Sequence, residues 1–243
     1  MDGRTMPLKY LPMLRAIIFD FDGVIADTEW LHSETFRRVL AEEGIYLSGA
    51  DQYERFLGIN DRAGFAMAFA EVGREVSPAA IAALVERKSA YYTSRLDEVK
   101  PFPGIVELVA ALSNRCPLAI ASGGHAAEID AVLRAHGLRE RFLAVVSADE
   151  VKRSKPAPDP FLEALRALRR ATLARATNLA PAECLVIEDS IHGIRGAKAA
   201  GMQCLAVAHT YAAERLAEAD RVVESIAEVK ADDLIREPGI GRE

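Results

Sequence analysis

Cysteine is scarce in this chain, and its three copies lie far apart. Cys116, Cys184 and Cys204 are too few and too widely separated to form a zinc-binding motif. An odd number of cysteines also suits reduced thiols better than a disulfide framework. We therefore expect a protein of a reducing compartment, and the predicted location is cytoplasmic.

Long apolar runs are absent as well. No stretch of the sequence is long and apolar enough to span a bilayer. Residues 1–14 mix Asp2, Arg4 and Lys9 with isolated apolar residues, and they lack the continuous apolar run of a secretion signal. The sequence thus predicts neither a membrane-spanning segment nor a signal peptide.

An excess of positive charge is also missing. The chain has 30 Lys and Arg against 36 Asp and Glu, and its formal net charge is −6. The basic residues are scattered, which argues against a nucleic acid or an anionic membrane as the main partner. There are no internal repeats or low-complexity tracts. A small ligand fits this composition better, and we expect a monomer or a weak homodimer.

Short apolar runs set the expected architecture. Half of the 243 residues are hydrophobic, and the length suits one core domain that carries an inserted module. The runs are rich in branched residues and alternate with segments of helical period, which predicts a doubly wound, Rossmann-like parallel sheet of the α/β class. The predicted strands are residues 14–19, 117–121, 142–147, 184–187, 204–208 and 221–223.

Residues 28–101 interrupt this alternation. They have an amphipathic helical pattern without a convincing strand, and Pro101 and Pro103 mark a boundary because proline cannot continue a helix. We predict a helical cap domain over residues 28–101, inserted between two segments of the core, residues 1–27 and 102–243. Later, residues 158–178 have the pattern of one long helix with a solvated basic face, to which we assign no role.

Pairs of acidic residues follow two of the predicted buried strands. Asp20 and Asp22 come where the first strand ends, and Glu188 and Asp189 follow residues 184–187. Burying a carboxylate is costly unless a cation or hydrogen bonds offset it. The two pairs should converge at the edge of the sheet, and a site of carboxylates without Cys or His favours a hard cation, of which Mg²⁺ is the expected one. A carboxylate beside Mg²⁺ can attack phosphorus.

Two further motifs are weak alone and gain weight from this setting. Ser122 and the glycines Gly123 and Gly124 follow the strand at residues 117–121 and are expected to open a helix, so the hydroxyl and N–H groups could hold phosphate oxygens there. Lys155 precedes Pro156, in a stretch where proline fixes the backbone. A fixed lysine can neutralise phosphate and aspartate together.

These residues, in this order at the ends of successive strands, resemble the four motifs of the haloacid dehalogenase-like hydrolase superfamily, over about residues 14–223. The helical insertion resembles the cap of the subgroup that contains β-phosphoglucomutase, phosphoglycolate phosphatase and CbbY-like phosphatases. The resemblance implies that Asp20 is the nucleophile and becomes an aspartyl phosphate, and that Asp22 is the acid and base and gives a backbone carbonyl to Mg²⁺. It further implies that Asp189 is a direct metal ligand, that Glu188 is a direct or water-mediated one, and that Ser122 and Lys155 hold the phosphoryl group.

The same resemblance implies substrate contacts from the cap. His32 and Lys88 fall where β-phosphoglucomutase carries functional residues, and Arg62 lies within one position of its substrate-binding arginine. Gly124 stands where the mutase has a second hydroxyl, so one substrate contact of the mutase is missing here. The substrate-binding candidates are Thr28, His32, Arg62, Lys88 and Gly123.

The leading prediction is a Mg²⁺-dependent phosphatase that hydrolyses a small sugar phosphate or a related phosphate monoester of metabolism. The alternative is a β-phosphoglucomutase-like phosphosugar mutase, in which a sugar hydroxyl attacks the aspartyl phosphate. Asp22 argues against a dehalogenase, because a halide needs no proton to leave. A phospho-aspartate signalling receiver is a more distant alternative, since its acceptor would lie at the third strand of a chain about half as long. A non-enzymatic binding protein on this scaffold is disfavoured because all four motifs retain their reactive groups.

Overall fold

The computed structural model describes residues 14–47, 55–56, 59–171 and 178–235. The chain divides into two compact units. Met1–Asp27 together with Lys100–Glu243 form one, which we term the core unit, and Thr28–Val99 form the other, which we term the helical unit. Among the helices of these described ranges, none combines the length and the apolar character that a membrane crossing requires.

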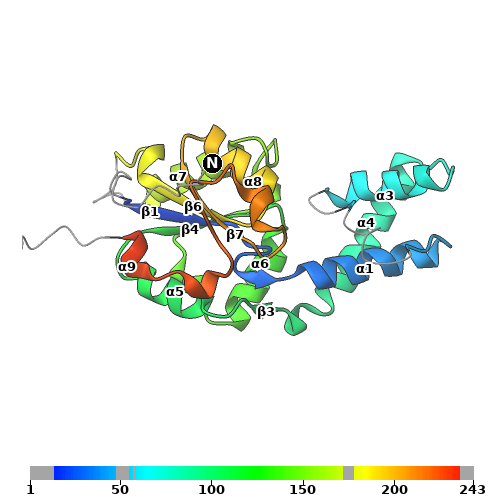
Figure 1. Cartoon of the computed structure of the whole chain (residues 1–243). Helices are drawn as coiled ribbons and strands as arrows, with labels where there is room; N and C mark the ends of the chain where they lie inside the picture. The colour runs from blue at the N-terminus through cyan, green and yellow to red at the C-terminus, as the bar shows by residue number, and fades with distance from the viewer. Residues whose placement is uncertain (1–13, 48–54, 57–58, 172–177, 236–243) are drawn as a thin grey trace, which may run out of the picture. The chain divides into compact units, whose positions relative to one another are not determined.

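A six-stranded parallel sheet lies at the centre of the core unit, with the order β5-β4-β1-β6-β7-β8 (Figure 1). The prediction of a doubly wound parallel sheet is confirmed, and each of the six predicted strands overlaps an observed one. The strands are β1 (Ala16–Phe19), β4 (Leu118–Ala121), β5 (Ala144–Val146), β6 (Cys184–Glu188), β7 (Gln203–Val207) and β8 (Arg221–Val223).

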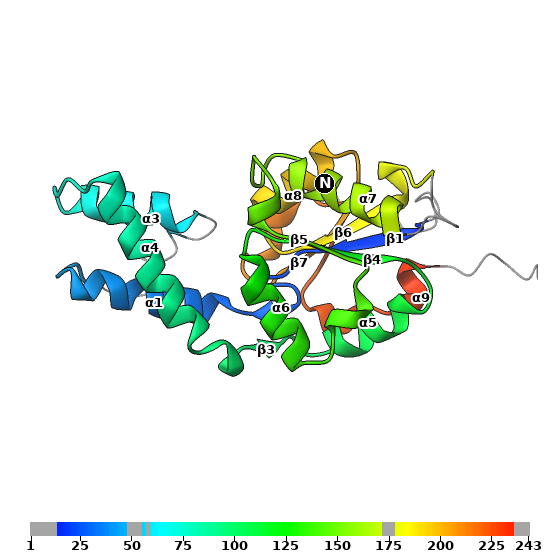
Figure 2. The same cartoon turned by 180° about the vertical axis from the view of Figure 1, so that it is seen from behind.

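Helices cover both faces of this sheet, with α7 and α8 on one face and α5, α6 and α9 on the other (Figures 1 and 2). Phe161 and Leu165 of α7 are buried against Ile18 of β1 and Val186 of β6. The helices are α5 (Ile105–Ser113), α6 (Ala126–Ala135), α7 (Asp159–Ala171), α8 (Ile191–Ala199) and α9 (Ala231–Leu234), and the short 3₁₀ segments are Arg139–Arg141, Ala148–Glu150, Pro181–Glu183, Ala213–Leu216 and Ile226–Glu228.

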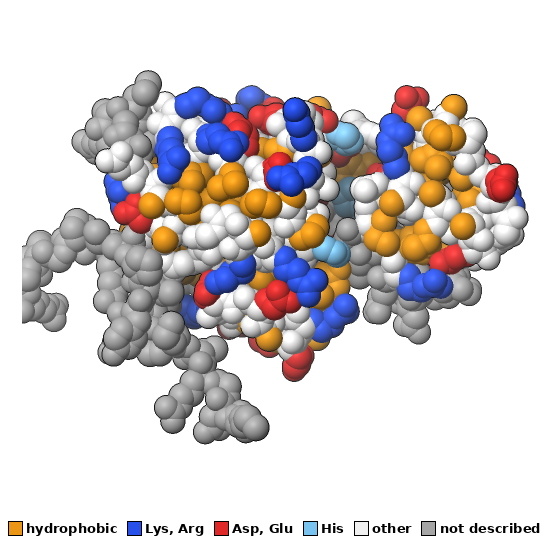
Figure 3. Space-filling model, turned by 90° about the horizontal axis from the view of Figure 1, so that it is seen from above, with side chains coloured by type: hydrophobic (Ala, Val, Ile, Leu, Met, Phe, Trp, Pro, Cys, Tyr) orange, Lys and Arg blue, Asp and Glu red, His pale blue; other side chains and the backbone are white. Residues whose placement is uncertain are grey.

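The basic side chains of α7 are engaged locally. Arg166 and Arg170 both pair with Glu163, at 2.8 and 2.9 Å, and Arg169 donates to the carbonyl of Leu179. Across this face of the molecule, Lys and Arg lie next to Asp and Glu (Figure 3). Such exposed pairs contribute about 0–1 kcal/mol each, so α7 presents an ordinary solvated surface. The predicted helix over residues 158–178 is observed as far as Ala171, and residues 172–177 lie outside the described ranges.

The helical unit has an apolar core of its own. Phe36 of α1, Phe65 of α3 and Leu84 of α4 are buried in one cluster. Polar N-cap residues cap the first turns of two of these helices. Asn60 Oδ1 accepts a hydrogen bond from Ala63 N at 3.0 Å in α3, and Ser77 Oγ accepts one from Ala80 N in α4. The elements are α1 (Glu29–Glu42), α3 (Asp61–Glu71), α4 (Pro78–Thr93) and the 3₁₀ segment Leu96–Glu98. These helices lie within residues 28–101, the segment for which the sequence predicts a helical cap domain.

A small two-stranded sheet lies where the chain leaves and re-enters the core unit. β2 (Ala26–Asp27) pairs antiparallel with β3 (Lys100–Pro101). These strands were not predicted, because two residues are too few to show a period of two and Pro101 was interpreted as a boundary alone. Proline is tolerated here because both strands are edges.

The three cysteines allow a test of how tightly the core is packed. All are free and buried, and burial raises the pKa of the Cys116 and Cys184 thiols to about 12 and that of Cys204 well above its ordinary value. We expect the native protein at pH 8 to react slowly with Ellman's reagent, because the reactive thiolate is rare and shielded. The denatured protein should release three equivalents at once. A thiol that reacts within seconds in the native protein would contradict this packing.

Candidate functional site

The register of the sheet brings the two acidic pairs together. Phe19 at the end of β1 is paired with Ile187 of β6, and Asp20 N donates to Ile187 O at 2.9 Å. Asp20, which follows β1, and Glu188, the last residue of β6, therefore lie at the same level on neighbouring strands. On the other side, Phe19 is paired with Ile120 of β4, so Ser122 leaves the sheet at this edge as well. The predicted convergence is observed.

Asp20, Glu188 and Asp189 form a compact buried cluster. Each offers a carboxylate oxygen, and these oxygens lie within 4.8 Å of one another. The residues are 7, 0 and 5% exposed. Lys155 Nζ lies 2.7 Å from Asp20 Oδ1 and 2.7 Å from Glu188 Oε1. Fully ionised, the three carboxyl groups would carry three negative charges, and Lys155 brings one positive charge to them.

Glu188 is held most firmly. Its Oε2 accepts hydrogen bonds from Asp189 N at 2.9 Å, from Ser190 N at 2.8 Å and from Ser190 Oγ at 2.9 Å. Burial alone would raise its pKa, but Lys155 and Ser190 overcome that effect, so the pKa of Glu188 is lowered. A Cβ atom on Gly193 of α8 would overlap this carboxylate, so the helix can approach it only with glycine at that position.

The other two carboxyl groups are less favourably placed as anions. Burial and the charge of Glu188 raise the pKa of Asp20 well above its ordinary value, although Lys155 acts against this. Burial, Glu188 and Asp20 raise the pKa of Asp189 in the same way. Burial disfavours the ammonium of Lys155, yet Asp20 and Glu188 outweigh it and raise the pKa of Lys155. The cluster is thus rich in negative charge and poor in positive charge.

Asp22 is two residues from Asp20, and Ser122, which follows β4, is its hydrogen-bond partner. Ser122 Oγ donates to Asp22 Oδ2 at 3.4 Å and accepts from Gly124 N at 2.9 Å. Asp22 is half-buried and Gly123 is exposed. The glycines do not open the following helix directly: α6 begins at Ala126, whose N–H donates to Asp149 Oδ2 at 3.2 Å. The expectation of a helix start at Gly123 and Gly124 was therefore early by two residues.

The remaining candidates lie in the helical unit. Lys88 is 4% exposed, and its Nζ lies 2.7 and 2.9 Å from the two carboxylate oxygens of Asp61 and 3.1 Å from His32 Nδ1. Thr28 is buried at the N-cap position of α1, and its side chain makes no capping hydrogen bond. Arg62 is exposed on α3. Among these predicted residues, the structure brings Lys88 and His32 together.

Two residues that contact the site were not predicted from the sequence. Thr210 Oγ1 donates to Asp189 Oδ2, and His209 Nδ1 lies 2.8 Å from the carbonyl oxygen of Gly23. One signal was present: both residues follow the predicted strand at residues 204–208, whose carboxyl end lies at the same edge of the sheet. Neither residue is acidic, so neither forms part of an acidic pair that the sequence would single out.

The cluster fits the hard cation that the sequence analysis expected. Its donors are carboxylate oxygens, which Mg²⁺ prefers. A divalent cation would balance the negative charge of the carboxylates that Lys155 does not neutralise. Gly23 leaves room for the Asp189 carboxylate, because a Cβ atom at this position would overlap Asp189 Oδ2, and we term this close approach the cradle. Asp20, Glu188 and Asp189 are thus the side chains that can hold the ion.

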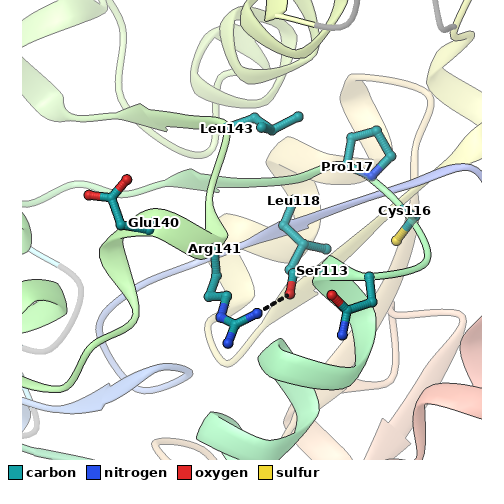
Figure 4. Close-up of a pocket in the computed structure, with 8 residues that line it drawn as sticks. Ser113, Cys116, Pro117, Leu118, Glu140, Arg141 and Leu143 are labelled. Carbon is teal, nitrogen blue, oxygen red and sulfur yellow. Dashed lines mark hydrogen bonds between the residues drawn. The ribbon is translucent and has the colours of Figure 1, made fainter.

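A pocket elsewhere in the core unit has a different character. It lies at the amino-terminal ends of β4 and β5, opposite the acidic edge, and encloses about 240 Å³ (Figure 4). Arg141 and Ser113 line it and approach each other at 3.5 Å. Its carboxylate comes from Glu140 alone, so we assign it no part in the chemistry of the acidic cluster.

Comparisons with known proteins agree with this geometry. Residues 17–207 match the family model described as haloacid dehalogenase-like hydrolase. The chain is 36% identical over 196 residues to fructose-1-phosphate phosphatase YqaB of Escherichia coli K12, covering 79% of this chain and 95% of that protein. It is similar to the crystal structure of CbbY from Rhodobacter sphaeroides in complex with phosphate, with a TM-score of 0.76, 30% identity and coverage of 89% of this chain and 96% of that one. For β-phosphoglucomutase from Clostridium difficile the TM-score is 0.77, the identity 28% and the coverage 90% and 94%.

Gly23 allows a test of the cradle with a matched control. Gly23 and Gly137 both have a positive φ, +76° and +66°, but a Cβ on Gly137 would meet nothing within 4 Å. We expect Gly137→Ala to lower the free energy of unfolding by about 1–2 kcal/mol through backbone strain alone. Gly23→Ala should add a loss of Mg²⁺ affinity of at least about tenfold, because its methyl displaces Asp189.

The two variants are compared by urea unfolding and by titration calorimetry with MgCl₂. If Gly23→Ala binds Mg²⁺ as tightly as Gly137→Ala, the contact between Gly23 and Asp189 has no part in holding the ion.

Proposed function

The chain belongs to the haloacid dehalogenase-like hydrolases, and we propose that within this family of enzymes it is a Mg²⁺-dependent phosphatase acting on a small sugar phosphate. The observation that carries the proposal is the position of Lys155. Its ammonium bridges Asp20 and Glu188 at the edge of the sheet where Asp189 also lies. A buried cation between two carboxylates suits a site that must accept a further anion, such as a phosphate monoester.

We assign the nucleophile to Asp20. Its Oδ1 accepts from Phe21 N at 2.7 Å and from Lys155, so the carboxylate is held in one orientation. In the first step a carboxylate oxygen of Asp20 bonds to phosphorus while the ester P–O bond breaks. Asp22 gives a proton to the departing alkoxide, which leaves as the free alcohol. Ser122, within hydrogen-bonding reach of Asp22, is placed to contact the phosphoryl oxygens.

The second step restores the enzyme. Asp22, now ionised, accepts a proton from a water molecule as the water oxygen bonds to phosphorus. The bond between phosphorus and Asp20 breaks, and inorganic phosphate leaves. A bound Mg²⁺ would supply charge neutralisation between the phosphate and the carboxylates, and Asp20, Glu188, Asp189 and the backbone carbonyl of Asp22 are the groups that we assign to hold it.

Two relatives support a phosphosugar as the substrate. The relative at 36% identity is named a fructose-1-phosphate phosphatase, and a Thermotoga maritima relative is named a phosphorylated carbohydrates phosphatase. Fructose 1-phosphate is therefore the first substrate that we would assay. A signalling receiver is disfavoured, because Asp20 follows the first strand of the sheet and not the third.

The mutase alternative rests on the similarity to β-phosphoglucomutase, and the helical unit bears on it. A mutase has to hold a sugar with a second phosphate, for which the free positive charge of Lys88 would be suited. In this chain both oxygens of Asp61 contact Lys88 Nζ, so its charge is already paired. This pairing and the missing hydroxyl at Gly124 favour water as the acceptor. We propose that His32, Lys88 and Thr28 contact the sugar hydroxyls. Arg62 and Gly123 are further candidates for substrate contacts.

Removal of the nucleophile tests the core of the proposal. We expect Asp20→Asn to fold and to lower kcat on an accepted substrate by at least about 10³-fold, because an amide does not attack phosphorus. Asp233→Asn, at an exposed position of α9, is the matched control and should retain full activity. The measurement is phosphate release with MgCl₂ and with EDTA. Turnover of Asp20→Asn above a few per cent of the wild type would remove Asp20 from the mechanism, and equal rates with EDTA would remove the metal.

Product analysis separates the phosphatase from the mutase. With β-glucose 1-phosphate and catalytic glucose 1,6-bisphosphate, or with fructose 1-phosphate, we expect free phosphate as the main product. Asp61→Asn should shift the partition toward the mutase, since it releases the charge of Lys88 for a second phosphate. Efficient formation of glucose 6-phosphate by the wild-type protein, abolished by Lys88→Ala, would establish the mutase instead.

A further inference from the structure

The residues that follow β7 contact the acidic edge although the proposed mechanism gives them no role. Thr210 Oγ1 donates a hydrogen bond to Asp189 Oδ2. His209, the residue before it, bonds to the carbonyl oxygen of Gly23 at 2.8 Å. This segment therefore touches the expected metal ligand Asp189 and the turn that follows Asp22.

Asp189 depends on this contact more than its neighbours do. Lys155 reaches Asp20 and Glu188, and Glu188 also has the hydroxyl and N–H of Ser190. Within the described part of the chain, the hydrogen bond of the Asp189 side chain is the one from Thr210 to Oδ2. Asp189 is only 5% exposed, so water does little to replace that bond.

The same oxygen is confined from a second direction. A Cβ atom on Gly23 would overlap Asp189 Oδ2 and would lie 3.0 Å from Thr210 Oγ1. Oδ2 thus sits between the backbone of Gly23 and the hydroxyl of Thr210. Because Oδ2 already accepts a hydrogen bond, Oδ1 has the greater capacity to bind a cation. The carboxylate cannot rotate without losing the Thr210 hydrogen bond.

His209 keeps Thr210 in place. Its ring stacks on Phe102, with ring centroids 4.0 Å apart and an angle of 19° between the planes. Nδ1 carries the proton, because its partner is the carbonyl of Gly23, and Nε2 accepts from Ile226 N at 3.4 Å. Three separate segments of the core unit therefore fix the start of this loop.

We propose that Thr210 is a positioning residue of the metal site: its hydroxyl orients Asp189 so that Oδ1 faces the bound ion. The inference rests on the proposed function, because it requires that Asp189 binds Mg²⁺. Partners that orient metal ligands commonly affect metal affinity by about 10–100-fold. Thr210 acts through Asp189 and has no contact with the reacting atoms.

The test is Mg²⁺ binding by titration calorimetry in the absence of substrate. Thr210→Val removes the hydroxyl and keeps the shape, and we expect its Kd to rise by about 10–100-fold. Thr210→Ser keeps the donor and should stay within about threefold of the wild type. Thr35→Val is the matched control: Thr35 is buried in α1, its hydroxyl bonds to Leu31 O at 2.7 Å, and its loss should leave the Kd unchanged.

Asp189→Asn separates this inference from the proposed function. If Asp189→Asn weakens Mg²⁺ binding and Thr210→Val does not, Thr210 has no positioning role and the proposed metal site stands. If Asp189→Asn binds Mg²⁺ like the wild type, the metal site and the inference both fail. A Thr210→Ser variant that loses as much affinity as Thr210→Val also overturns the role of the hydroxyl. Circular dichroism checks folding, and Thr210→Ala replaces Thr210→Val if the latter does not fold.

Discussion

The burial of three carboxyl groups beside a single lysine is the constraint on which the rest of the core unit depends. Carboxylates at such depth are unfavourable unless charge and hydrogen bonds compensate them. Lys155 compensates Asp20 and Glu188, Ser190 and two backbone N–H groups serve Glu188, and Thr210 serves Asp189. The pKa values of Asp20 and Asp189 remain raised all the same. A site with this surplus of negative charge is suited to bind a divalent cation, which is the requirement of the proposed reaction.

The parallel sheet is what makes such a cluster possible. In a parallel sheet, all the strands end at one edge, so residues far apart in the chain arrive at the same place. The pairing of Phe19 with Ile187 sets Asp20 beside Glu188. Glycine at position 23 lets the backbone approach the Asp189 carboxylate closely, and glycine at position 193 does the same for Glu188. A shift of one residue in the register between β1 and β6 would separate the two acids. The buried apolar runs that form these strands therefore also set the geometry of the site.

The helical unit is stabilised by contacts of its own. Its phenylalanine cluster gives it a separate core, and its own ion pair joins Lys88 to Asp61. All the groups assigned to the chemistry lie in the core unit, whereas the candidates for sugar recognition lie mostly in the helical unit. Substrate preference can thus change through substitutions in one unit while the reaction of the other is retained, as is common when function resides in sites placed on a shared fold.

The amino-acid sequence was enough to predict the class of fold and the six strands, and to place the acidic residues at one edge of the sheet. These features are local in the sequence. An apolar run indicates a buried strand, and an acidic residue directly after such a run indicates a functional site, because burying a carboxylate is costly. Which groups compensate those acids depends on contacts between residues that are distant in the chain. Thr210 meets Asp189, Lys155 meets Glu188 and Asp61 meets Lys88 across 21, 33 and 27 residues. The tertiary structure also sets the start of α6 at Ala126, whose N–H donates to Asp149, and it pairs β2 with β3. Such contacts depend on strand register and on the paths of loops. A hydroxyl or a surface acid belongs to no periodic sequence pattern, so its contacts cannot be predicted from the sequence.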